Sequence, residues 1–167
     1  YPLRRQRQMC IRDRNKGDIF ILTGSNKKVG LGHKRRSIQL SSTLKEEGFN
    51  TTLKNYYESP WEEIVKIVNN NQYNYIILDL PFYHKKVIKY FEKKKVIALD
   101  YFGDDYLPLT ISVFKHKSSN NAGTKLFGLK YAIIRSDVLD FRPKGDFLTK
   151  NIKNILIIMG SGDLKNF

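Results

Sequence analysis

Cysteine is almost absent from this sequence, and long apolar runs are missing altogether. The chain of 167 residues holds one cysteine, Cys10, which excludes an internal disulfide framework and indicates a reducing, cytoplasmic environment. No apolar run approaches the roughly 18 residues that cross a bilayer, so no membrane span is predicted. Apolar residues still make up 41% of the chain. This composition and length predict one globular domain with a hydrophobic core, and exclude two full α/β domains.

Acidic residues are scarce as well, since 16 Asp and Glu stand against 30 Lys and Arg, for a net charge of +14. The first 14 residues, YPLRRQRQMCIRDR, hold five of the nine arginines, and RQRQMCIRDR resembles translated sequencing-adapter sequence. We therefore expect residues 1–14 to be a non-native tail, with a genuine basic arm as the alternative. Without the five Arg and one Asp of this segment, +14 becomes +10.

The remaining positive charge is mostly lysine and is spread along the chain. Lys85, Lys86 and residues 93–95 form short runs on expected helix surfaces. A nucleic-acid-binding protein would instead concentrate arginine and aromatic residues on one face. A solvated surface without a nucleic-acid partner is therefore predicted, and a basic nucleic-acid-binding module stays as an alternative of a different class.

Short apolar runs alternate with segments of helical periodicity. Strands are expected at residues 18–22, 49–53, 75–80, 96–100, 111–114, 131–135 and 155–159, and helices at 33–47, 60–70 (with Ser59 as N-cap) and 84–94. Strands this apolar, joined by helices, are typical of a parallel sheet with helices on both faces, which is a Rossmann-like α/β fold. We expect residues 15–153 to form this domain and residues 154–167 to begin a second one.

The sequence VGLGHKRRS, residues 29–37, places a histidine behind two glycines at the expected start of a helix. Gly30 and Gly32 permit a tight turn and a close approach of the backbone to a ligand, because they lack a Cβ. The positive end of the helix dipole favours the neutral form of His33. A neutral imidazole is a competent general base or hydrogen-bond partner, so this segment predicts one of these roles for His33, with a capping or surface histidine as the alternative.

Two acids, Asp79 and Asp100, end neighbouring expected strands. Ligands of parallel sheets bind outside the carboxyl ends of the strands, so both side chains are expected near His33. The other two histidines, His84 and His116, have no partners at a spacing that indicates a metal site. The sequence therefore predicts a site without a metal or cofactor.

Five segments together resemble nucleotide-sugar enzymes with the two-domain GT-B architecture, of which this chain would be the N-terminal half. GLGHKRRSIQLSSTLKEEGF is similar to their GxGHxxR…L…L…G element, and YIILDL and VIALD are similar to two strands that end in an acid. FGLKYAIIRSDV is similar to a Gly-x-x-Tyr-x-x-x-Arg segment, and ILIIMGSGDLKN to the turn that opens the second domain. The resemblance is to the UDP-sugar hydrolase of pseudaminic-acid biosynthesis and to related spore-coat polysaccharide proteins.

This resemblance implies a hydrolase that releases UDP from a UDP-2,4-diacetamido-2,4,6-trideoxy sugar in nonulosonic (pseudaminic-type) acid biosynthesis. It implies that His33 is the catalytic base. Substrate contacts would come from Gly30, Gly32, Arg36, Asp79, Asp100 and Arg135, and nucleotide contacts from Gly160, Ser161, Gly162, Asp163 and Asn166.

Several positions depart from the family pattern, among them Leu80, Pro81 and Tyr101. A GT-B glycosyltransferase of cell-surface polysaccharide synthesis and a noncatalytic sugar-binding remnant therefore remain alternatives. In this architecture the second domain carries most nucleotide contacts, and only its first strand and turn are expected here. We therefore expect the chain to be a fragment that is inactive by itself.

Overall fold

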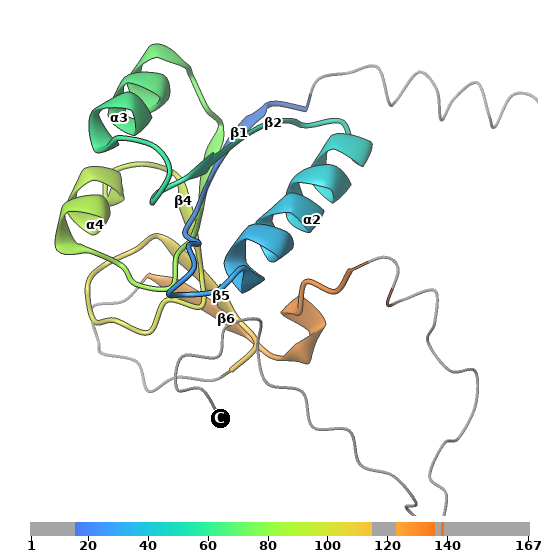
Figure 1. Cartoon of the computed structure of the whole chain (residues 1–167). Coiled ribbons are helices and arrows are strands. Elements are labelled where there is room, and N and C mark those ends of the chain that lie inside the picture. The colour runs from blue at the N-terminus through green and yellow to red at the C-terminus, as the bar shows by residue number, and fades with distance from the viewer. Residues whose placement is uncertain (1–15, 115–122, 136–137, 139–167) are drawn as a thin grey trace, which may run out of the picture.

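The computed structural model describes residues 16–114, 123–135 and 138. These residues form one six-stranded parallel sheet in the order β2-β1-β3-β4-β5-β6, with helices on both faces (Figure 1). The predicted Rossmann-like α/β class is thus confirmed. The strands are β1 (Asp18–Thr23), β2 (Asn50–Asn55), β3 (Tyr75–Asp79), β4 (Val96–Leu99), β5 (Leu109–Ser112) and β6 (Thr124–Phe127). The helices are α2 (Gly32–Glu46), α3 (Trp61–Asn70), α4 (Lys85–Phe91) and the short 3-10 helix η1 (Leu129–Tyr131).

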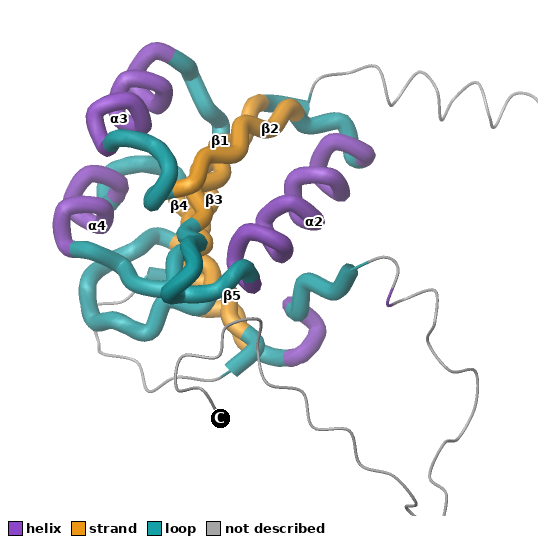
Figure 2. Tube along the Cα trace, in the orientation of Figure 1, coloured by secondary structure: helices purple, strands orange, loops and turns teal. Residues whose placement is uncertain are grey.

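Successive strands are added on opposite sides of the pair formed by β1 and β3. From β1 the chain passes through α2 to β2 on one side, and from β3 it passes through α4 to β4 on the other. Figure 2 shows α2 on one face of the sheet, with α3 and α4 on the opposite face. The carboxyl ends of β1 and β3 therefore form the switch point at which open parallel sheets bind ligands.

The face covered by α3 and α4 holds the larger core. Side chains alternate along a strand, so Phe20, Leu22 and Leu78 point to this face. They pack with Ile64 of α3 and Phe91 of α4, both of which are fully buried. Burying these apolar side chains is the main source of stability of the fold.

The face covered by α2 has a smaller core, made by Ile19, Ile21, Ile77 and Leu99. Leu40 and Leu44 of α2 lie on it and are only partly buried. The residues of α2 that are buried are both serines, Ser37 and Ser41, whereas Ile38 is 50% exposed. This helix therefore brings polar groups to the sheet as well as apolar ones.

Two predicted helix boundaries need correction. The N-cap of α3 is Pro60 and not Ser59, and no side chain caps the helix. The last turn of α4 ends at Phe91, and Lys94 N–H donates to Phe91 O in the turn that follows. Both shifts are local, because the next strand begins close to its predicted position at Val96.

The predicted strand at 131–135 is wrong. The edge strand of this region is Thr124–Phe127, and the chain turns away from the sheet at Gly128, which has a φ of 120°. Ile133 instead packs as a loop residue against the α2 face, whereas Ile134 is 48% exposed. The predicted strand at 155–159, like the second domain expected at 154–167, lies outside the described residues.

No helix in the described part of the chain is long and apolar enough to cross a bilayer.

Candidate functional site

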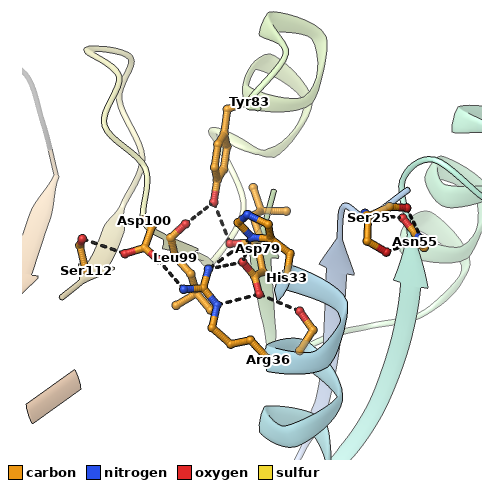
Figure 3. Close-up of polar contacts among 11 residues, drawn as sticks. Ser25, His33, Arg36, Asn55, Asp79, Tyr83, Leu99, Asp100 and Ser112 are labelled. Carbon is orange, nitrogen blue, oxygen red and sulfur yellow. Dashed lines mark hydrogen bonds and ion pairs between the residues drawn. The ribbon is translucent and has the colours of Figure 1, made fainter. Parts of the chain in front are cut away.

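Asp79, the last residue of β3, is at the centre of the candidate site (Figure 3). It points to the same face of the sheet as Ile77, because side chains alternate along a strand, and α2 covers that face. The side chain is fully buried. A buried carboxylate is unfavourable without hydrogen-bond donors, and the first turns of α2 supply them.

Three side chains of α2 donate to Asp79. His33 Nδ1 lies 2.7 Å from Oδ1, and Ser37 Oγ donates to Oδ2 at 2.9 Å. Arg36 donates from Nε to Oδ2 at 3.1 Å and from Nη2 to Oδ1. Residues three and four positions apart share one face of a helix, so this part of α2 presents all three donors to the end of β3.

The surroundings of Asp79 also fix its charge. Burial alone would raise the pKa of the carboxyl group, but the hydrogen bonds from His33 and Arg36 and the charge of Arg36 outweigh burial and hold that pKa below its usual value. Asp79 is therefore ionised at neutral pH and only accepts hydrogen bonds.

Because Asp79 only accepts, the proton of their shared hydrogen bond is on His33 Nδ1. The 3.4 Å contact between Arg36 Nη2 and the same nitrogen then joins two donors and is not a hydrogen bond. In a neutral ring, Nε2 of His33 is left as an acceptor. The His33 side chain is 26% exposed and that of Asp79 is not exposed at all. A buried carboxylate behind a partly exposed imidazole is the arrangement of an oriented general base.

Arg36 links Asp79 to the next strand. Its Nη1 donates to Asp100 Oδ2, and Asp100 follows directly after β4. Burial would lower the pKa of Arg36, but its hydrogen bonds and ion pairs with the two carboxylates raise it. The guanidinium therefore stays charged, and two residues predicted to bind substrate are bound to each other.

Asp100 is held in place from β5. Its φ of 51° lies in the left-handed region, which aspartate tolerates better than most residues. Its N–H donates to Ile111 O at 2.9 Å, and Ser112 Oγ donates to its Oδ1 at 2.8 Å. One carboxylate oxygen is thus fixed by β5 while the other binds Arg36.

The glycine loop between β1 and α2 closes on itself. Gly30 has a φ of 80°, and its N–H donates to Asn26 O at 2.9 Å. The Asn26 side chain accepts from the N–H groups of Lys28 and Val29. A Cβ added to Gly32 would meet nothing within 4 Å. Gly30 therefore supplies the turn, and Gly32 borders open space at the start of α2.

Sequence analysis missed several polar residues at this edge. Ser37 could have been found, because it lies four residues after His33 on the same helix face. Tyr83 could not, since only the fold brings its hydroxyl 2.8 Å from both Leu78 O and Leu99 O, at the ends of β3 and β4. Burial raises the pKa of Tyr83, so it remains a hydrogen-bond donor.

Ser25 and Asn55 form a second buried polar pair, at the ends of β1 and β2 (Figure 3). Asn55 Oδ1 accepts from Ser25 N–H at 3.1 Å, and Asn55 Nδ2 donates to Ser25 O at 2.9 Å. These bonds tie the start of the glycine loop to β2. Thr23, beside them, has a buried hydroxyl that has no hydrogen-bond partner within the described residues.

The structure therefore brings together four predicted site residues, His33, Arg36, Asp79 and Asp100. Arg135 is exposed, two residues beyond the point where Ile133 packs on the α2 face. The predicted nucleotide contacts lie outside the described residues; they are Gly160, Ser161, Gly162, Asp163 and Asn166.

Two hollows differ in size and place. A cavity of about 20 Å³, lined by Arg36, Asp100, Ser112 and Tyr131 among others, adjoins the site and has room for about one water molecule. A larger hollow of about 480 Å³, with residues 93–95 in its wall, lies at the opposite edge of the sheet, where β3 and β4 begin. Only the smaller of these two cavities is lined by residues of the candidate site. No three metal-ligating side chains gather anywhere in residues 16–114 and 123–135.

Comparison with known proteins adds no family to this description. No protein-family model matches the chain, and no curated protein matches it significantly. The geometry around Asp79 and the motif resemblance are therefore the features that bear on function.

Proposed function

We propose that this chain is the sugar-facing domain of a nucleotide-sugar hydrolase that releases UDP from a UDP-2,4-diacetamido-2,4,6-trideoxy sugar. The observation that carries the proposal is the 2.7 Å hydrogen bond between His33 Nδ1 and Asp79, placed at the switch point of the sheet. The identity of the nucleotide and sugar, and a role in cytoplasmic synthesis of nonulosonic acids, rest on the motif resemblance.

His33 is the general base in this mechanism. Its Nε2 takes a proton from water as the water oxygen bonds to the anomeric carbon of the sugar. The bond from that carbon to the phosphate oxygen breaks, and UDP leaves with the electron pair. Asp79 stays ionised and stabilises the imidazolium that forms. Because UDP is a good leaving group, one base suffices, and attack opposite UDP inverts the anomeric centre.

The proposal is tested in the longest natural protein that contains this chain. The purified protein is incubated with the UDP-sugar in water enriched in oxygen-18, and UDP release and the position of the label are measured. Attack at the anomeric carbon puts the label in the sugar. Oxygen-18 found in UDP would contradict hydrolysis by this route. Release of UDP only when a separate sugar is added as acceptor would also contradict it. The second result would support a glycosyltransferase.

Substitution of the base gives the sharper result. His33→Gln and His33→Ala are expected to lower kcat about 100-fold or more with little change in KM, because a general base acts only in the transition state. His84→Gln is the matched control, since His84 occupies the N-cap position of α4, makes no side-chain capping hydrogen bond and stacks its ring on Tyr56. Parent-like turnover in both His33 variants would remove His33 from the mechanism.

The nucleic-acid alternative is tested with duplex DNA. Strong, sequence-tolerant binding that persists after deletion of residues 1–14, measured over a salt series, would favour that class over a sugar enzyme.

A further inference from the structure

A continuous set of polar contacts runs from β5 to the imidazole of His33. Ser112 donates to Asp100, Arg36 donates to both Asp100 and Asp79, and Asp79 accepts from His33 (Figure 3). Ser112 lies in β5, Asp100 directly follows β4 and Asp79 ends β3, while Arg36 and His33 lie in α2. We propose that Arg36 and Asp100 are positioning residues, which fix the orientation of the Asp79 carboxylate and thereby the tautomer of His33.

The first argument is the geometry of the guanidinium. Arg36 uses Nε and Nη2 on the two oxygens of Asp79, and such a bidentate pair ties the plane of the carboxylate to the plane of the guanidinium. Oδ1 is thereby held toward His33. A lysine ammonium is a single point charge and would not define this plane.

The second argument is the need for an external anchor. An arginine side chain has many rotamers, and fixing one of them costs conformational entropy. Nη1 of Arg36 is held by Asp100, which is itself held by Ser112 and by its backbone bond to Ile111. The rotamer of Arg36 is therefore selected from β4 and β5, and not by α2 alone.

The third argument concerns charge. Arg36 faces two carboxylates, Asp79 and Asp100, so its positive charge is already compensated within the protein. Three of the five N–H groups of Arg36 are already used on these carboxylates, which weakens its attraction for an anionic part of a substrate. This favours positioning over the direct substrate contact that the sequence suggested for both residues.

The two roles predict different measurements. A residue that only binds substrate changes KM when it is replaced and leaves the free imidazole as it was. A positioning residue changes the balance of the two neutral tautomers of His33 without any substrate, and lowers kcat more than it raises KM.

The test uses nitrogen-15 NMR of the histidine rings in the full 167-residue chain, above the pH at which imidazole is protonated. The parent protein is expected to show His33 mainly as the Nδ1–H tautomer. Asp100→Ala and Arg36→Lys are expected to shift the tautomer ratio about threefold or more toward Nε2–H. Asp104→Ala and Arg35→Lys, at exposed positions, are the matched controls and should leave the ratio unchanged. An unchanged ratio in both site variants would overturn the proposal.

Ser112→Ala keeps the test decisive if a charged-residue variant does not fold. It removes one hydroxyl and should shift the tautomer ratio in the same direction by a smaller amount. Ser42→Ala, at an exposed position of α2, is its control. A folded Ser112→Ala protein with the parent ratio, when the other variants are unfolded, would also overturn the proposal.

A second readout rests on the proposed hydrolase function. In the active protein, Asp100→Ala should lower kcat about tenfold with KM near the parent value. A tautomer shift in the 167-residue chain, together with no hydrolase activity in the longer natural protein, would support positioning and contradict the proposed function. Parent-like kcat in a folded, active Asp100→Ala enzyme would contradict positioning and leave the hydrolase intact.

Discussion

The two faces of the sheet are built from different chemistry. The face under α3 and α4 is filled by apolar and aromatic side chains, and the buried residues of α3 are Ile64 and Val68. The face under α2 has fewer buried apolar residues, and α2 buries Ser37 and Ser41. Both faces belong to the same strands, whose residues alternate between them. One face can therefore stabilise the fold while the other carries a buried carboxylate.

The largest loss of stability is expected from a substitution in the apolar face, under α3 and α4. Phe91→Ala should lower the free energy of unfolding by about 3–5 kcal/mol, because it leaves a cavity among fully buried neighbours. Chemical denaturation followed by circular dichroism measures this loss. Phe82→Ala is the control, since Phe82 is 62% exposed, and should change stability by less than about 0.5 kcal/mol. Equal effects of the two substitutions would contradict the assignment of the core.

A second substitution breaks the polar face. Asp79→Asn should cost about 2–3 kcal/mol at pH 7, because three donors lose a charged acceptor in a buried place. Asp104→Asn, at an exposed position, is the control. Denaturation curves at pH 7 give both values. An Asp79→Asn protein with the parent's free energy of unfolding would show that this carboxylate contributes nothing to stability.

The same pair of proteins predicts a pH dependence. The folded-state pKa of Asp79 is lowered, so its contribution to stability is present above the unfolded pKa of about 3.9 and is lost as the pH falls through the lower folded value. The stability difference between the parent and Asp79→Asn should therefore shrink below about pH 4. A difference that grew toward acid pH would mean that the folded pKa is raised.

A smaller effect separates the two buried serines of α2. Ser37→Ala removes one hydrogen bond to a charged group, and should cost about 1–2 kcal/mol. Ser41→Ala removes the 2.7 Å hydrogen bond to Thr51, which is between neutral groups, and should cost about 0.5–1 kcal/mol. Only Ser37→Ala is expected to alter the tautomer ratio of His33. A reversed order in either measurement would contradict the central place of Asp79.

The smallest expected effect is on the outer side of the same helix. Ile38 follows Ser37 directly but is half exposed, so Ile38→Gln should change stability by less than about 0.5 kcal/mol. Ile64→Gln places the same polar side chain in the core and is expected to cost several times more. Thermal unfolding of both variants compares the two helices directly. A large loss in Ile38→Gln would indicate a partner covering this part of α2.

Much of the fold could be predicted because its signals are local. The apolar runs around Ile77 and Ala98 identified two central strands, and Gly48, with a φ of 91°, follows the C-cap of α2, where a C-terminal glycine was expected. The strand expected at 131–135 was predicted from the same kind of apolar run as the central strands, but it does not form. Ile133 does become partly buried, but as a loop residue, while Ile134 is 48% exposed, and the apolar pattern alone does not distinguish a loop from a strand.

The candidate site was predicted in part. His33, Asp79 and Asp100 were placed together by the rule that ligands collect at the carboxyl ends of parallel strands. Their pairing was not predictable, because Arg36 and Asp100 are 64 positions apart, and Ser112 and Tyr83 give no local signal of their contacts. Contacts of this kind depend on strand order and register.

Periodicities within single segments set the class of the fold, the positions of the central strands and the face of α2 that bears His33, Arg36 and Ser37. Which acid meets which base depends instead on how the strands are arranged in the sheet. The order β1-β3-β4-β5 sets the ends of the strands beside one another. It thereby buries Asp79 under α2 and turns Arg36 from an expected substrate ligand into a bridge between two carboxylates.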